Sequence, residues 1–261
     1  MRYIRLYKEF FKQSLMKLMA YRLNFFIIFI TNFTYFTVQI IFLQVIFSKV
    51  DSLAGWTKYE MIFYIGTFNI IDSLFIFGPY FNLLSLPELI RRGMLDYYIT
   101  KPVNSQFIIS LKNVEIGSLI SVIGGISITL YALVEGDMTL TFGRVILYVI
   151  AIFHSLLVEY AVYLMLTCLS FWTVKTDFVE KIHGIICYFS NRPLDIYKGV
   201  IRFVLCYILP YGFAMTVASK SAVKNITLSE YVTFLLLSWC FLGASLLFWR
   251  FSLRRYSSAS S

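Results

Sequence analysis

Charged residues are scarce in this chain. Asp, Glu, Lys and Arg make up only 14% of its 261 residues, whereas a soluble domain carries about 25%. Residues 23–48 contain no charge at all, and this run exceeds the ~20 residues that a helix needs to cross a bilayer. The scarcity of charge argues against a soluble protein. It predicts one all-α membrane domain over residues 1–261.

The common signatures of ATP-hydrolysing and metal-dependent enzymes are also missing. No Gly-Lys dipeptide occurs, so the chain has no GxxxxGK[ST] phosphate-binding loop. HExxH and GxSxG are absent, only two histidines are present, and the four cysteines form no CxxC pair. We therefore predict no catalytic residue, no metal site and no cofactor bound by this chain. The cysteines are expected to act as small apolar packing residues.

Basic residues gather at the ends of the apolar runs. The net charge is +9, and residues 2–22 hold six Lys or Arg against one Glu. Such residues contact anionic lipid headgroups and mark the cytoplasmic side, so we predict lipid rather than nucleic acid as the partner of this charge. Within 2–22 the apolar residues recur every three or four positions, which predicts an interfacial amphipathic helix. The connection 82–106 and the C-terminal tail are basic too, which favours cytoplasmic termini and an even number of spans.

The apolar runs predict six spans, with one of them open to two interpretations. The predicted spans are about 23–48, 60–81, 107–134, 144–172, 173–191 and 229–251. Hydropathy alone would place the fifth at 200–219 and leave 173–199 as a cytoplasmic helix. In the other interpretation 173–191 crosses the membrane, and 193–218 dips into the outer leaflet and returns. Irregular backbone at that depth requires protein or a water-filled cavity to cover it.

A short cytoplasmic stretch, 84–106 (LSLPELIRRGMLDYYITKPVNSQ), lies between the second and third predicted spans. Pro87 suits a helix start, and Glu88 in the first turn complements the helix dipole. Apolar residues here would be unnecessary in a solvated connector, so a helix over 86–98 is predicted to dock on a partner. Its charged side would act as the lever and two leucines would fill a socket. The predicted docking residues are Glu88, Leu89, Arg91, Arg92, Leu95 and Asp96.

Three features carry a family resemblance. The chain resembles permease subunits of type-2 ATP-binding-cassette (ABC) exporters in its basic first helix and in two segments, G-M-L-D-Y-Y-I-T-K-P-V-N (93–104) and R-P-L-D-I-Y…I-R…I-L-P (192–210). More narrowly, the chain is similar to six-span bacterial permeases encoded beside a second permease and a separate ATPase. The resemblance implies a coupling helix between spans two and three and a re-entrant segment at 193–218. The sequence V-A-S-K-S-A stands where the family pattern has a proline near Ala218 or Ser219.

The resemblance also implies a function. The chain would be a non-catalytic permease subunit of the plasma membrane that exports an amphipathic or lipid-like compound, such as a drug, a peptide antibiotic or a lipid-linked molecule. An ABC ATPase dimer would bind ATP and Mg²⁺, and a second permease, more often paralogous than identical, would complete the assembly. The alternative is a secondary transporter or membrane scaffold that works without an ATPase.

A few polar residues lie inside predicted spans. Asp72 in span two and Glu159 in span four each cost about 2.5–3.5 kcal/mol at mid-helix on insertion scales. They are therefore expected to face the protein interior or a cavity. Together with His154 they are the candidates for a translocation path. Structural hydrogen bonding to Asn69, His154 or nearby tyrosines is the other interpretation.

Overall fold

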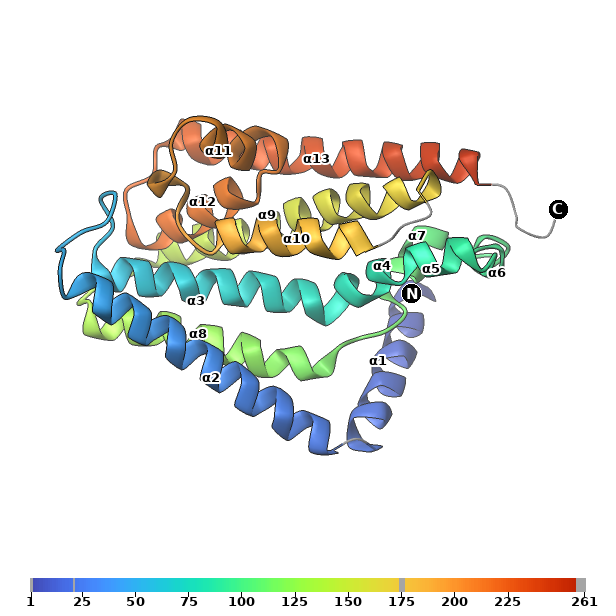
Figure 1. Cartoon of the computed structure of the whole chain (residues 1–261), viewed down its shortest axis with the longest axis horizontal. Helices are drawn as coiled ribbons and strands as arrows, with labels where there is room; N and C mark the ends of the chain where they lie inside the picture. Colours follow the sequence, from blue (N-terminus) through green and yellow to red (C-terminus); the bar gives the residue numbers. More distant parts are fainter. Residues whose placement is uncertain (1, 21, 174–176, 257–261) are drawn as a thin grey trace.

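The computed structural model describes residues 2–20, 22–173 and 177–256 (Figure 1). It is 82% helical, and no strand occurs in the described ranges. Long apolar segments form helices because a bilayer offers no partner for a free backbone N–H or C=O. In chain order the helices are α1 Arg2–Ala20, α2 Arg22–Phe47, α3 Lys58–Phe75, α4 Phe81–Leu84, α5 Leu86–Arg91, α6 Asp96–Ile99, α7 Ser105–Leu111, α8 Leu119–Glu135, α9 Phe142–Cys168, α10 Asp177–Ser190, α11 Gly199–Phe203, α12 Tyr211–Val223 and α13 Leu228–Arg255.

Five helical stretches of the described chain are long and apolar enough to cross a membrane. They are Phe26–Phe47, Lys58–Arg91, Ile116–Glu135, Phe142–Phe171 and Leu228–Arg255. A bent pair, Gly199–Ile208 and Tyr211–Val223, turns by 83° and is either a broken sixth span or a re-entrant loop. The prediction of an all-helical protein with several spans is thus confirmed. Of the predicted fifth span, 174–176 lie outside the described residues, and the 14-residue α10 is too short to be counted with the long helices.

The third span begins later than the sequence predicted. Helix α7 ends at Leu111, and the spanning stretch starts only at Ile116. Between them the chain is held by Asn82, whose side-chain nitrogen donates to the Asn113 carbonyl at 2.7 Å and whose oxygen accepts from the Asn113 N–H at 3.0 Å. Polar residues interrupt the apolar run at this point, and their backbone is bonded to a side chain instead of continuing a helix.

Helix α3 forms the axis of the bundle and crosses α8 at very short range. A Cβ atom at Gly66 would lie 2.9 Å from the carbonyl oxygen of Gly125. At Gly125 a Cβ would lie 3.0 Å from the carbonyl oxygen of Gly66. Small residues let membrane helices approach in this way, where packing rather than water exclusion holds them together. Helices α9, α10 and α12 cover the other side of α3 (Figure 1).

The two ends of the bundle differ. The start of α1 and the end of α13 lie at the end that carries α4 to α7, which is called the end with the termini below, and α1 is steeply inclined to α2 (Figure 1). The opposite end holds loop 48–57 and α11. A chain whose first and last helices end on the same side crosses the membrane an even number of times. The five long helices reach an even number if either α10 or the bent pair supplies a sixth crossing.

At the end opposite the termini, polar contacts tie the bent pair to the bundle. Asp195 accepts a hydrogen bond from the Trp56 indole N–H at 3.1 Å and pairs with Lys220 at 3.0 Å. The ammonium group of Lys224 lies 4.3 Å from the Trp56 ring centroid. These contacts join loop 48–57, the turn after α10 and α12 into one cap.

Candidate functional site

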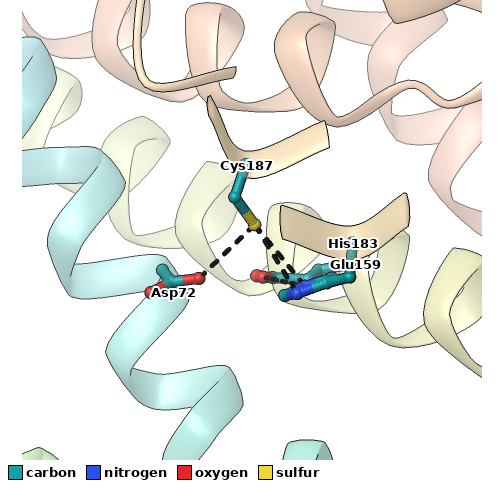
Figure 2. A group of neighbouring side chains, drawn as sticks. All are labelled: Asp72, Glu159, His183 and Cys187. Atoms are coloured by element: carbon teal, nitrogen blue, oxygen red, sulfur yellow. Dashed lines mark hydrogen bonds and ion pairs between the residues drawn. The ribbon is translucent and has the colours of Figure 1, made fainter. Parts of the chain in front are cut away.

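A polar cluster lies in the interior of the helical bundle. It consists of Asp72 from α3, Glu159 from α9, and His183 and Cys187 from α10 (Figure 2). One donor atom from each of these four side chains lies within 4.8 Å of every other. Figure 2 shows the four side chains pointing toward one another from three helices. The arrangement could hold a cation or share protons.

The contacts within the cluster are close, but most are longer than ordinary hydrogen bonds. The Cys187 sulfur lies 3.5 Å from Nε2 of His183 and 3.8 Å from Oδ1 of Asp72. Nε2 of His183 lies 3.8 Å from Oε1 of Glu159. Sulfur contacts at these distances are typical of weak bonds, and a nitrogen–oxygen distance of 3.8 Å is too long for a hydrogen bond. The four side chains therefore converge without satisfying one another.

Glu159 is the least satisfied member of this cluster. It is 1% exposed, and neither of its carboxylate oxygens has a hydrogen-bond partner in the described structure. The hydroxyl of Tyr211 donates a hydrogen bond to the backbone carbonyl oxygen of Glu159 at 3.1 Å, and so does not satisfy the carboxylate. A buried carboxylate without a partner is expensive, so such a group calls for an explanation.

Aromatic rings enclose the imidazole of His183. The ring centroids of Tyr163, Tyr80, Phe75 and Tyr211 lie 4.8, 5.2, 5.9 and 6.0 Å from its own. Asp72 is only half-buried, so the cluster is most accessible from the side of Asp72.

The structure brings together two of the three residues predicted to line a translocation path. Asp72 and Glu159 do face the interior and lie together, but His154 lies elsewhere. Its Nδ1 is 2.9 Å from the Ile150 carbonyl oxygen, and its ring is 5.9 Å from that of Trp239 on α13. Glu159 follows His154 by five residues, which separates the two side chains by about 140° around the helix axis. They therefore occupy different faces of α9.

His183 and Cys187 were not among the predicted path residues. Cys187 was expected to be apolar packing, yet its sulfur belongs to the cluster. The available signal was their spacing, because residues four apart lie on one helix face. That spacing identifies a shared face, but it does not reveal which acids the face meets.

The predicted docking helix 86–98 is instead two short helices. Helix α5 ends at Arg91 and α6 begins at Asp96, because Gly93 adopts φ +68°, which a right-handed helix does not contain. On the exposed face of α5, Arg91 donates two hydrogen bonds to the Glu88 carboxylate, at 2.7 and 2.8 Å, and Arg92 contacts the same carboxylate. The hydrogen bond from Arg91 makes the largest contribution, and together these contacts lower the pKa of Glu88 to about 2.

The socket-filling role predicted for Leu89 and Leu95 requires exposure that the structure does not show. Leu95 is fully buried and Leu89 is 7% exposed. Both pack inside the chain itself, so the apolar residues that segment 86–99 leaves exposed are Met94, Tyr97 and Ile99. Asp96 is half-buried and lies near Tyr256.

Comparison with known families decides the class of protein. The family model described as "ABC-2 family transporter protein" matches residues 33–260. The chain belongs to the ABC-2 transporter family. A search of curated proteins gives no match. The resemblance to type-2 ABC permeases noted in the sequence is thereby confirmed, and the protein is a membrane permease of an ABC transporter.

Both candidate sites of this ABC-2 permease lie within the matched residues. The polar cluster draws on three helices of the central bundle, and α5, whose exposed face carries the ion pairs of Glu88, lies at the end with the termini (Figure 1). The two sites are connected through the structure, since Phe75 and Tyr80 contact His183 and Phe75 also packs against the core under α5.

Proposed function

We propose that this ABC-2 permease is the non-catalytic membrane subunit of an exporter, driven by a separate ABC ATPase dimer that binds ATP and Mg²⁺. The absence of a phosphate-binding loop in the sequence supports a separate site of hydrolysis. Family membership supports a transport role. The proposal rests chiefly on one observation. Segment α5–α6 has an exposed charged side and an apolar side that is buried in the chain.

The segment α5–α6 is charged on its outer side and anchored on its inner side. Leu83, Leu86 and Leu95 are fully buried in one apolar cluster with Leu164 of α9 and Trp249 of α13. A force applied to the exposed face of α5 would therefore reach the ends of α9 and α13 directly. The leucines act as the anchor of a lever, and the exposed Glu88, Arg91 and Arg92 form the surface that the ATPase pushes.

The end with the termini faces the cytoplasm in this proposal. Arg91, Arg92, Lys101, Arg254 and Arg255 all lie in segments at that end. Basic residues at the ends of spans are retained on the cytoplasmic side. The cap around Asp195 and Trp56 then lies on the outer side, and the bent pair α11–α12 is a re-entrant segment entered from outside.

A second permease, paralogous rather than identical, completes the assembly. Helix α2 supports this, because only 6% of the residues in its most apolar stretch are buried inside the chain. Its outer face is open to lipid or to another subunit. A single chain whose helices pack around α3 does not by itself enclose a path. Such a path would lie between two permeases.

The proposed cargo is amphipathic or lipid-like and moves outward. An apolar groove of about 540 Å³ lies between α2 and α8. Its aromatic and branched lining includes Phe29, Phe33, Phe36, Ile120 and Ile123. A surface of this kind accepts apolar groups without fixed pairing, as concave apolar ligand sites do.

The decisive experiment reverses charge on the proposed lever. In the double variant Arg91→Glu/Arg92→Glu, we expect a loss of ATPase co-purification, or of transport-coupled ATP turnover, while the permease still elutes as a folded species. The matched control is Arg254→Glu/Arg255→Glu, which makes the same change of charge at exposed residues outside the segment. Wild-type coupling in the Arg91/Arg92 variant, or equal loss in both variants, would contradict the proposed lever.

A further inference from the structure

We propose that Asp72, Glu159, His183 and Cys187 form a binding site for one divalent transition-metal ion of the Zn²⁺ class. The cluster supplies one thiol, one imidazole and two carboxyls. Those are the donor types that Zn²⁺ takes in proteins, and four of them make the closed tetrahedral shell of a structural site. The inference is independent of the exporter proposal, because it concerns what the cluster binds and not what the protein moves.

The spacing of the donor atoms fits such an ion. With Zn–S near 2.3 Å and Zn–N or Zn–O near 2.0–2.2 Å, tetrahedral geometry places ligand atoms roughly 3.3–3.6 Å apart. The sulfur–imidazole distance is 3.5 Å, and the sulfur–Asp72 and imidazole–Glu159 distances are both 3.8 Å. All four donor atoms lie within 4.8 Å of one another. Shifts of about 1 Å or less, within reach of side-chain torsions, would complete the shell.

A second observation independently points to a ligand. Both carboxylate oxygens of Glu159 lack a hydrogen-bond partner among the described residues, although the residue is 1% exposed and points into the cluster. A buried acid normally has its hydrogen bonds made by the protein. Here the protein leaves both oxygens free beside a second carboxyl and a thiol, which is the arrangement a bound cation would satisfy.

The charges of the four side chains also favour a bound cation. Two carboxylates and a thiolate this close repel one another in a low-dielectric interior, whereas a divalent cation at their centre compensates most of that charge. The surrounding rings of Tyr80, Tyr163 and Tyr211 would exclude water from the ion. Since the ligands come from α3, α9 and α10, the ion would fasten the short α10 to the two long helices beside it.

The test uses Co²⁺ as a spectroscopic probe on the full chain, purified in the assembly it forms and stripped with a chelator. We expect one Co²⁺ per chain with tetrahedral visible absorption and a sulfur-to-cobalt charge-transfer band. Cys187→Ala should abolish that band. Asp72→Asn, Glu159→Gln and His183→Gln should each weaken Zn²⁺ competition at least about tenfold, since even outer-shell changes cost that much.

Matched controls separate the site from other thiols and imidazoles. Cys168→Ala and His154→Gln remove a buried cysteine and a buried histidine outside the cluster, and both should bind as the wild type does. His183→Cys keeps a soft donor at the same position and should retain binding with a second thiolate in the spectrum. This variant guards against loss of binding through misfolding.

Three outcomes would overturn the proposal. They are no Co²⁺ band in the wild-type chain, a band that survives Cys187→Ala, and equal weakening in the control variants. In the first case the cluster does not take up a divalent transition-metal ion. Because no transport is measured, failure of metal binding leaves the exporter proposal standing, and failure of ATP coupling leaves the metal site standing.

Discussion

Helices α2 and α3 are consecutive in the chain and both strongly apolar, yet they occupy opposite environments. Of the most apolar stretch of α2, 6% of the residues are buried in the protein, against 78% for the span that begins with α3. The difference shows that hydropathy predicts that a helix lies in the membrane, but does not predict whether it faces lipid or other helices. Lipid tails and packed side chains are equally apolar. What marks α3 as the axis is its small and polar content, with Gly66 against α8 and Asp72 in the cluster.

The same substitution on the two helices should have very different costs. Phe63 on α3 is fully buried, whereas Phe33 on α2 is 65% exposed. Phe63→Ala leaves a cavity and should destabilise the fold by about 3–5 kcal/mol, as large-to-small changes in a core do. Phe33→Ala should change the stability of the isolated chain by less than about 0.5 kcal/mol. Thermal unfolding in one detergent, followed by gel filtration, compares them, and equal costs would contradict the contrast between the helices.

A milder change tests the close approach of α3 and α8. The Cβ added by Gly66→Ala would lie 2.6 Å from Cγ2 of Thr129, so the helices must separate. Overpacking of this kind costs about 1–3 kcal/mol. Gly243→Ala in α13 is the matched control, since no atom lies within 4 Å of its added Cβ. A lowered unfolding temperature in both variants alike would point to a general intolerance and not to the contact.

The smallest expected effect concerns the pH dependence of the ion pairs on the exposed face of α5, outside the membrane. The pKa of Glu88 is lowered from 4.5 to about 2, first by the hydrogen bond from Arg91 and then by that from Arg92. A lowered folded-state pKa contributes stability that is complete above 4.5 and is lost as the pH falls toward 2. The unfolding temperature of Glu88→Gln should therefore lie slightly below that of wild type at pH 7, and the gap should close between pH 4.5 and 2. A gap that instead closes above pH 5 would refute the pKa assignment.

The sequence predicted the class of fold because each span carries its own signal. Long uncharged runs predict the spans locally, and three of the five long helical stretches begin and end near their predicted bounds. The second begins near its predicted start but continues to Arg91, ten residues past the predicted end at 81. The third begins later than predicted, since averaging over an apolar run concealed Lys112, Asn113 and Glu115 at its start. The order of helices around α3 was not predictable, because it depends on contacts between segments far apart in the chain.

The candidate sites were predictable only in part, for the same reason. Asp72 and Glu159 stand out because each is costly in lipid, so their inward orientation follows from composition alone. Their meeting with Cys187 does not, since it joins residues 115 positions apart. Leu89 and Leu95 show the converse difficulty. An apolar residue in a connector indicates burial, but the local sequence does not distinguish a partner's surface from the chain's own core.

The shortness of α10 affects how the wall of the bundle is built across the membrane. Its 14 residues span about 21 Å, roughly 9 Å less than a ~30 Å hydrocarbon layer. Its last residue, Ser190, accepts a hydrogen bond from Tyr64, which lies six residues inside the start of α3. Above that level the bundle is completed by the turn at Asp195 and by α12, not by a continuous helix. In the orientation proposed above, α10 therefore cannot line the whole depth of the layer, and the wall beyond its last residue is built by a segment that folds back instead of by a helix that crosses.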